Sequence, residues 1–353
     1  MTVPEAAMPP GLFVPSAGKC VISSDSQCRD NRMTAGTLFV RVASKRLEAT
    51  DIYSFELVRP GGEPLPRFSP GAHIDVFVPG GPIRQYSLCN DAAETHRYVI
   101  GVLRDPASRG GSQAMHESVN EGDVISIGEP RNNFTLRLGA AHSVLIAGGI
   151  GITPLLCMAR HLASIGASFE LHYFCRSRSR AAFQVALSSP PFDGRAHLHV
   201  SESSGSSNEA ITHLLANLSM DAQLYVCGPE GFIEKTLLAA RERGWAEDDV
   251  HIERFAPVSH TDSDSEPFDL HLARTGTTVH VPSGVSAAQA LAQAGIEIAL
   301  SCEQGVCGTC VTRVLGGIPD HRDMFLLPEE QAQNDRFTPC CSRARSASLI
   351  VDL

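Results

Sequence analysis

The sequence predicts a multidomain chain of α/β and β architecture: an antiparallel β-barrel, a parallel-sheet α/β domain and a small C-terminal β-grasp domain. Three observations lead to this prediction. Residues 37–139 are short β-type runs separated by turn residues, residues 140–257 alternate β-type runs with helices, and residues 267–353 combine a hairpin, a helix and a Gly-rich cysteine loop. Short strands set apart by Gly, Pro, Asn and Asp favour a barrel. Strands alternating with helices favour a parallel sheet.

Composition and charge restrict the class of protein. The chain has 353 residues, 43% of them hydrophobic and 19% charged, as in ordinary globular proteins. Its net charge of −10 argues against nucleic acid as a partner, and we expect no membrane span. The Pro-, Ser- and Gly-rich residues 1–36 are predicted to be a disordered extension, and residues 258–266 a polar linker. Most cysteines are scattered singly, which predicts free thiols in the cytoplasm.

Each strand of the barrel is predicted from a β-type run. One stretch, residues 112–119, is predicted to form a short helix. The predicted strands are TLFVRVASKR (37–46), YSFELVRP (53–60), HIDVFVPGG (73–81), IRQYSLCN (83–90), RYVIGVLR (97–104), DVISIGEP (123–130) and FTLRL (134–138).

The α/β segment is predicted from strand–turn–helix repeats. SVLIAGG (143–149) is an apolar strand, and a helix follows at 153–166 with Thr153 as N-cap, Pro154 at its first position and Gly166 at its end. Further strands are expected at FELHYF (169–174), HLHV (197–200), QLYVC (223–227) and VHIERF (250–255), and a helix after Pro229. In the last module, a hairpin turning at Thr275–Gly276 precedes a helix at 286–295.

Four cysteines carry the strongest chemical signal. Cys302, Cys307, Cys310 and Cys340 form a C-x4-C-x2-C…C array, the spacing of a plant-type [2Fe–2S] cluster. A zinc site or a disulfide framework is the alternative, but zinc sites favour paired C-x2-C motifs, and the chain has no second such pair. From spacing alone, either Cys340 or its neighbour Cys341 can be the fourth ligand.

Two barrel motifs point to a flavin. Arg84, Tyr86 and Ser87 lie on one strand, where an Arg can clamp a phosphate and an aromatic ring can lie against a flat one. The Gly-rich turn Arg109, Gly110, Gly111 and Ser112 opens a short helix and can present N–H groups to an anion. Either motif alone is usually structural. A single phosphate cradle favours FMN over FAD.

Two turns of the α/β segment point to a nicotinamide dinucleotide. The first contains Gly149, Gly151, Thr153 and Pro154, and the second contains Cys227, Gly228 and Pro229. Both follow parallel strands, at the edge where such sheets bind ligands. Cys227 can equally be a small buried residue. Arg176, Arg178 and Arg180 are a solvated run or a site for the adenosine end, so the sequence leaves NADH and NADPH open.

These motifs, in this order, resemble the phthalate dioxygenase reductase family, which includes vanillate demethylase-type reductases. The resemblance covers residues 37–353. It implies FMN on Arg84, Tyr86, Ser87 and the 110–112 turn, NADH on the two α/β turns, Phe255 near the flavin, and Cys340 as the fourth cluster ligand.

The function that the resemblance implies is electron transfer from NAD(P)H through FMN and the cluster to a Rieske-type terminal oxygenase acting on an aromatic acid or a small amine. Such a relay needs no acid, base or nucleophile, so no catalytic residue is predicted. Two alternatives stay open: a stand-alone quinone reductase and a cluster-based redox sensor. Residues 266–353 hold ten acidic residues, six Arg and no Lys, which predicts an acidic docking face.

Overall fold

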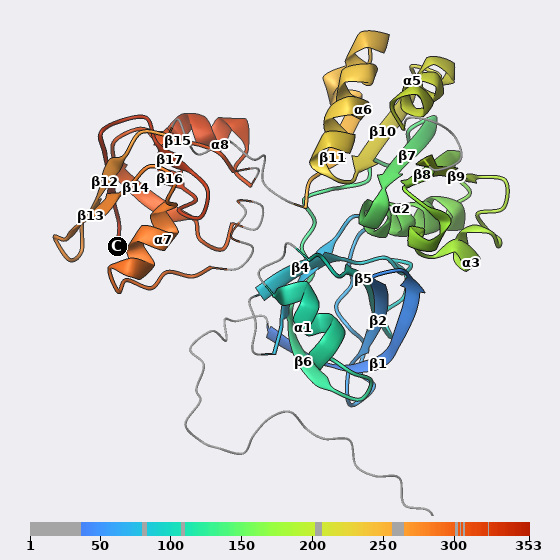
Figure 1. Cartoon of the computed structure of the whole chain (residues 1–353), viewed down its shortest axis with the longest axis horizontal. Helices are drawn as coiled ribbons and strands as arrows, with labels where there is room; N and C mark the ends of the chain where they lie inside the picture. Colours follow the sequence, from blue (N-terminus) through green and yellow to red (C-terminus); the bar gives the residue numbers. More distant parts are fainter. Residues whose placement is uncertain are drawn as a thin grey trace, which may run out of the picture.

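The computed structural model describes residues 37–79, 83–106, 110–201, 207–255, 265–300, 303, 305, 308–323 and 325–353. The predicted extension and most of the predicted linker lie outside these residues. Figure 1 shows a barrel (blue to teal), an α/β layer structure (green to yellow) and a separate small module (orange to red). This is the mixed α/β and β class that the sequence predicts.

The barrel is one sheet of six strands in the order β4-β3-β6-β1-β2-β5, with every neighbouring pair antiparallel. A bridge between Leu88 and Ile100 joins the two edges, so the sheet closes. Phe55, Leu57 and Ile127 fill its interior, fully buried. The elements are β1 Thr37–Ala49, β2 Ile52–Val58, β3 His73–Phe77, β4 Ile83–Ser87, β5 Tyr98–Leu103, α1 Gly111–Ser118 and β6 Val124–Gly128.

The strand predicted at residues 134–138 is absent from the structure, which has irregular backbone there. Phe134 and Leu136 are buried in a core shared with the α/β sheet. The backbone N–H of Arg137 donates to the hydroxyl of Tyr225 at 2.9 Å, instead of joining a strand ladder. The apolar alternation of FTLRL thus reflects a segment that covers a core.

The α/β module is a parallel sheet in the order β11-β10-β7-β8-β9. Helix α2 packs its apolar side into the core on one face, and α5 and α6 pack into the core on the other. The elements are β7 His142–Gly148, η1 Gly149–Gly151, α2 Ile152–Ser164, β8 Phe169–Cys175, η2 Arg178–Arg180, α3 Gln184–Leu187, β9 Ala196–Val200, α5 Ser207–Asn217, β10 Ala222–Cys227, α6 Glu230–Arg243, η3 Glu247–Asp249 and β11 Val250–Glu253.

The start of α2 differs from the prediction. The helix begins at Ile152, directly after the 3-10 turn, so Gly151 is the N-cap and Thr153 and Pro154 lie inside the first turn. The Thr153 hydroxyl donates to the carbonyl of Ile150 at 3.1 Å, so it bonds backward into the turn instead of capping. Pro154 is tolerated because first-turn N–H groups have no helical acceptor.

The barrel and the α/β module share one hydrophobic core. Ile52 of the barrel belongs to the same buried cluster as Leu155 of α2 and Phe183. At Gly101 of β5, a Cβ would lie 2.7 Å from the Cγ2 of Thr153, so only glycine permits this approach. The shared core holds the carboxyl ends of the parallel strands beside the barrel.

The C-terminal module has its own core and a mixed sheet in the order β13-β12-β18-β14-β16. Strand β12 pairs antiparallel with β13 and parallel with β18. The hairpin turns at Gly276, which has a φ of +70°, and Ser286 begins α7 with a capping box. Its elements are β12 Phe268–Leu272, β13 Thr278–Val281, α7 Ala287–Gln293, β14 Thr312–Gly316, β15 Pro319–Asp320, α8 Pro328–Gln333, β16 Arg336–Phe337, β17 Arg343–Ala344 and β18 Ser348–Val351.

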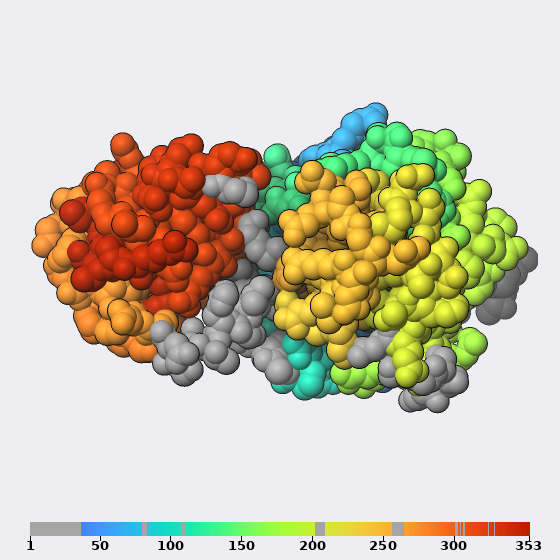
Figure 2. All heavy atoms as spheres, turned by 90° about the horizontal axis from the view of Figure 1, so that it is seen from above, coloured from blue at the N-terminus to red at the C-terminus, as the bar shows by residue number. Residues whose placement is uncertain are grey.

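Seen from above, this module lies to one side of the other two (Figure 2). Among the helices that the structure describes, none has the length and apolar character that a membrane crossing requires.

Candidate functional site

Three strand ends converge where the barrel meets the parallel sheet. Ser87 ends β4, Cys227 ends β10 and Glu253 ends β11. The Cys227 thiol donates to Oε2 of Glu253 at 3.9 Å, and the Ser87 hydroxyl is also hydrogen-bonded to this carboxyl. Ser87 and Cys227 are buried. The group therefore links the predicted flavin strand to the predicted nicotinamide turn.

The electrostatics of this group favour neutral side chains. Burial of the carboxyl raises the pKa of Glu253 to about 8, although the Ser87 and Cys227 hydrogen bonds oppose the shift. Burial also raises the pKa of the Cys227 thiol well above its usual value, and the nearby Glu253 adds to the effect. At neutral pH the group thus consists of a hydroxyl, a thiol and a protonated carboxyl.

Glu253 was missed by the sequence analysis, which assigned a role only to Phe255 in the same E-R-F run. The available signal was an acidic residue at the end of a β-type run. Phe255 itself is 37% exposed. Between them, Arg254 bonds Glu230 of α6 through Nε at 2.9 and 3.0 Å and so holds the end of β11.

The predicted phosphate cradle is partly assembled. Gly111, the first residue of α1, lies so close to Arg84 that a Cβ would be 2.7 Å from the Arg84 Cγ. Gly110 precedes the helix with a φ of +87°. Ser112 is buried, and its hydroxyl accepts from the N–H of Asp105 at 3.2 Å. The structure thus brings Arg84 to the N-terminus of α1, a favourable place for an anion. Arg109 lies outside the described residues.

The surroundings of Tyr86 indicate whether the barrel residues suit a bound ligand. Its hydroxyl is buried and, among the described residues, has no hydrogen-bond partner. Burial raises the pKa of this phenol strongly. An unsatisfied buried hydroxyl costs about 1–3 kcal/mol, so a polar ligand group at Tyr86 would remove a real penalty. The barrel residues therefore fit a phosphorylated ring compound such as a flavin.

A cavity of about 620 Å³ lies off the carboxyl ends of the parallel strands. Gly148, Gly149 and Pro229 line it from the α/β module, and Ile52 and Leu103 line it from the barrel. Pockets of 300–1,000 Å³ typically hold small ligands. The volume and position suit a nicotinamide dinucleotide.

Two buried glycines next to the lining residues Gly149 and Pro229 are required by close packing. A Cβ on Gly151 would lie 2.3 Å from the carbonyl oxygen of Cys227, and one on Gly228 would lie 3.0 Å from the Cα of Gly148. Thr153 is buried, like Pro154, inside α2. These two residues shape the turn and do not line the cavity, whereas Gly149 does.

The three arginines of the predicted run, Arg176, Arg178 and Arg180, differ in their position relative to the cavity. All three residues are exposed, but only Arg176 and Arg180 line the cavity. Arg180 also contacts Asp51 of the barrel, Nη2 to Oδ2, at 3.4 Å. Arg176 is thus the member of the run placed both at the cavity and at the end of β8.

The cysteine array is described at two of its four positions. The Sγ atoms of Cys310 and Cys340, thirty residues apart in sequence, lie 3.3 Å from each other. Two sulfurs at this distance can share one metal centre. Cys302 and Cys307 lie outside the described residues. The Sγ of Cys341 lies 3.3 Å from the Thr338 hydroxyl.

Two glycines permit the loop around this pair. Gly305 has a φ of +73°, and a Cβ there would lie 2.4 Å from the Sγ of Cys341. Gly308 has a φ of +71°, and a Cβ there would lie 2.2 Å from the ring of Phe325. Side chains at these positions would be strained and would clash.

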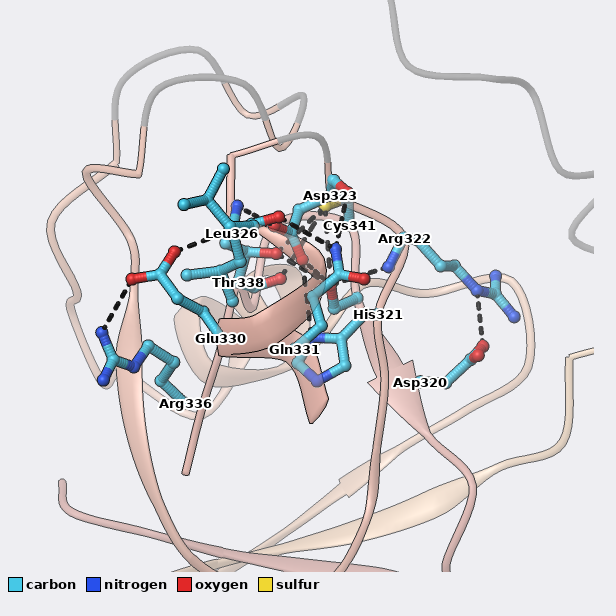
Figure 3. A network of polar contacts seen from close by, with 12 residues as sticks. Asp320, His321, Arg322, Asp323, Leu326, Glu330, Gln331, Arg336, Thr338 and Cys341 are labelled. Atoms are coloured by element: carbon cyan, nitrogen blue, oxygen red, sulfur yellow. Dashed lines mark hydrogen bonds and ion pairs between the residues drawn. The ribbon is translucent and has the colours of Figure 1, made fainter. Parts of the chain in front are cut away.

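A buried polar network supports the cysteine region (Figure 3). The Asp323 carboxylate accepts from the N–H of Leu326 at 2.8 Å and from the Ser342 hydroxyl at 3.2 Å. Ser342 also lies 2.8 Å from the Thr338 hydroxyl. The network ties Asp323 and Leu326 to the segment that carries Cys340 and Cys341.

Comparison with known proteins agrees with this arrangement. Residues 270–345 match a family described as 2Fe-2S iron-sulfur cluster binding domain. Residues 129–250 match the N-terminal domain of the dimethylamine monooxygenase subunit DmmA-like family. A vanillate O-demethylase oxidoreductase from Pseudomonas putida is 50% identical over 313 residues, which cover 88% of this chain and 98% of that protein. This chain belongs to the same family.

The similarity extends to solved structures. A phthalate dioxygenase reductase, described as modular for electron transfer from pyridine nucleotides to [2Fe-2S], matches with a TM-score of 0.70 and 38% identity, covering 90% of this chain and 98% of that one. A tetrachlorobenzoquinone reductase from Sphingobium chlorophenolicum is 40% identical over 308 residues, covering 86% and 94%.

The family assignment defines the class of activity. The chain is an electron-transfer oxidoreductase with a flavin- and NAD-binding reductase fold and a [2Fe–2S] domain. The fold that it shares with phthalate dioxygenase reductase supports FMN and NADH as its other cofactors. It is a reductase of the kind that serves oxygenase systems.

Proposed function

We propose that this chain takes electrons from NADH and delivers them singly, through its [2Fe–2S] domain, to a Rieske-type terminal oxygenase. The observation that carries the proposal is the convergence of Ser87, Cys227 and Glu253. It joins the predicted flavin strand to the predicted nicotinamide turn at one point. Bound FMN supplies the conversion between a two-electron donor and one-electron carriers.

The residues of the chain act by binding and orientation. Arg84 and the Gly110–Ser112 turn hold the flavin phosphate, and Tyr86 contacts the flavin. Gly149 and Arg176 would contact the dinucleotide, and Gly151 and Gly228 let the two turns pack together beside Cys227. Cys302, Cys307, Cys310 and Cys340 hold the cluster, with the short Cys310–Cys340 contact supporting Cys340 over Cys341.

The substrate of the oxygenase is proposed to be a small aromatic acid with a methoxy group, because a vanillate O-demethylase component is 50% identical to this chain. We place the protein in the cytoplasm, where NADH is available. Among the described cysteines, Cys89, Cys157 and Cys227 are buried and form no disulfide, as expected in a reducing compartment.

Reconstitution tests the proposal. The purified chain, NADH and a purified Rieske-type vanillate demethylase oxygenase should together convert vanillate, and omission of the chain should abolish turnover. Turnover that proceeds equally with a cluster-free Cys310→Ser variant would contradict the proposed route.

A second function is favoured by the similarity to tetrachlorobenzoquinone reductase. In that case the chain itself would reduce a quinone, with no partner protein. Fast NADH-dependent loss of a halogenated quinone, together with failure to support any oxygenase, would select this alternative.

A further inference from the structure

A cluster of ligating side chains lies on the outer part of the parallel sheet, beyond the function proposed above. Glu170 and His172 project from β8, and His197 projects from the edge strand β9. One ligand atom from each lies within 4.8 Å of those of the other two. His172 and His197 are directly paired in the β-ladder, and their rings stack with centroids 4.9 Å apart.

We propose that Glu170, His172 and His197 form a binding site for a divalent transition-metal ion, with Zn²⁺ as the best match. Two imidazole nitrogens and one carboxylate oxygen are a donor set that Zn²⁺ accepts, whereas Mg²⁺ and Ca²⁺ prefer oxygen donors alone. Three protein ligands leave the fourth tetrahedral position for water.

The distances need only small side-chain movements. Donor atoms bonded tetrahedrally to one Zn²⁺ lie roughly 3.3 Å apart, given bonds of about 2.0–2.1 Å. Nε2 of His172 and Oε2 of Glu170 are already 3.1 Å apart. His197 is exposed, so its ring is free to rotate towards this pair.

A hydrogen bond on the other side of its ring already orients His172, the buried ligand. Nδ1 of His172 lies 3.1 Å from Nε2 of His199, and the His199 ring stacks on Phe174 with centroids 4.3 Å apart and planes 9° apart. Metal-binding histidines commonly donate their second N–H to a hydrogen-bond acceptor, and the Nε2 lone pair of His199 can be that acceptor. With the proton on Nδ1 donated to His199, the Nε2 lone pair of His172 points to Glu170.

The competing interpretation is a plain hydrogen-bond chain. His199 would donate to His172, and His172 would donate to Glu170, with no ion involved. In the absence of an ion both interpretations fit the same heavy-atom positions, and they differ in tautomer and in metal affinity. Measurement of metal binding therefore separates them.

The test is equilibrium dialysis of the tag-free holoprotein, with flavin and cluster in place, against chelator-buffered Zn²⁺, with zinc counted per flavin by mass spectrometry. We expect one zinc per chain at micromolar free Zn²⁺ or below. His197→Gln and Glu170→Gln should each weaken binding at least tenfold, and His199→Gln should weaken it less. His280→Gln is the matched control, because His280 is an exposed histidine paired with a single carboxylate, Asp269.

Flavin and cluster content of each variant shows that it is folded, and His197 is exposed enough to tolerate replacement. Two results would overturn the proposal: no zinc bound up to about 100 µM free Zn²⁺, or zinc bound equally well by the wild type, His197→Gln and Glu170→Gln.

Discussion

Glu253 is the residue on which the chemistry of the domain junction depends most. Its carboxyl contacts the Cys227 thiol at 3.9 Å and is hydrogen-bonded to Ser87. Because burial raises its pKa to about 8, the carboxyl carries a proton at neutral pH. Above that pKa a negative charge forms at the junction, which would disfavour the reduction of a flavin bound beside it.

NADH oxidation with a small-molecule dye should therefore fall as pH rises through about 8. In Glu253→Gln, which cannot ionise, this fall should vanish. Steady-state rates of NADH oxidation between pH 6 and 9.5 check this prediction. Glu63→Gln is the control, because the Glu63 side chain is 62% exposed on the barrel. It should retain the wild-type pH profile. An unchanged break in Glu253→Gln would show that another group titrates.

The two adjacent cysteines provide a second test at single-residue resolution. Cys340→Ser should lose the cluster, since its sulfur lies 3.3 Å from that of Cys310. Cys341→Ser should keep it, because the Cys341 sulfur contacts Thr338. Iron and acid-labile sulfide per chain should fall to near zero in the first variant alone; the opposite pattern would make Cys341 the ligand.

At the scale of elements, the turn between β7 and α2 must approach the end of β10 closely. A Cβ on Gly151 would lie 2.3 Å from the Cys227 carbonyl oxygen, and two backbone segments cannot yield as a flexible side chain would. Gly151 has a φ of −61°, so lack of space, and not backbone conformation, demands glycine.

Gly151→Ala should lower the free energy of unfolding by about 1–3 kcal/mol, the usual cost of overpacking, and should raise the KM for NADH. Gly231→Ala in α6 is the stability control, because a Cβ there meets no atom within 4 Å. Its stability should stay level or rise by up to about 1 kcal/mol. Urea unfolding compares them, and equal stability of both variants would contradict the packing argument.

The elements were largely predictable because turns and glycines mark them clearly, as at Gly276 and at Gly166, which has a φ of +68°. Two predictions failed for tertiary reasons. FTLRL covers a core instead of pairing, and Thr153 lies inside α2 because the preceding 3-10 turn moves the helix start to Ile152. Neither packing partner is visible in a local stretch of sequence.

The site shows the same limit. Motifs such as R-Q-Y-S-L and C-G-P could each be recognised in the sequence. The hydrogen bond between Ser87 and Glu253, however, joins strands of two modules that are 166 positions apart. The sequence offered no measure of that distance. The metal-type cluster on β8 and β9 was missed for a similar reason, since it depends on the ladder pairing of His172 with His197.

At the scale of the whole molecule, the C-terminal module stands to one side of the other two (Figure 1). Ten acidic residues against six Arg in residues 266–353 favour docking on a basic partner surface. Charge attraction between proteins weakens as salt screens it.

Raising ionic strength from about 0.02 to 0.5 M, where the Debye length falls several-fold, should slow electron delivery to the oxygenase several-fold. NADH oxidation with a small neutral dye, which needs no docking, should change little. Parallel slowing of both reactions would count against an electrostatic docking face.

We propose that this one chain relays electrons from a hydride donor to an iron–sulfur cluster. The most direct test of this relay is an anaerobic titration of the purified protein with NADH, followed by visible absorption and by electron paramagnetic resonance of the cluster. We expect bleaching of both flavin and cluster absorbance, with a reduced [2Fe–2S] signal that Cys310→Ser lacks. Flavin that bleaches while a fully loaded cluster stays oxidised would contradict it.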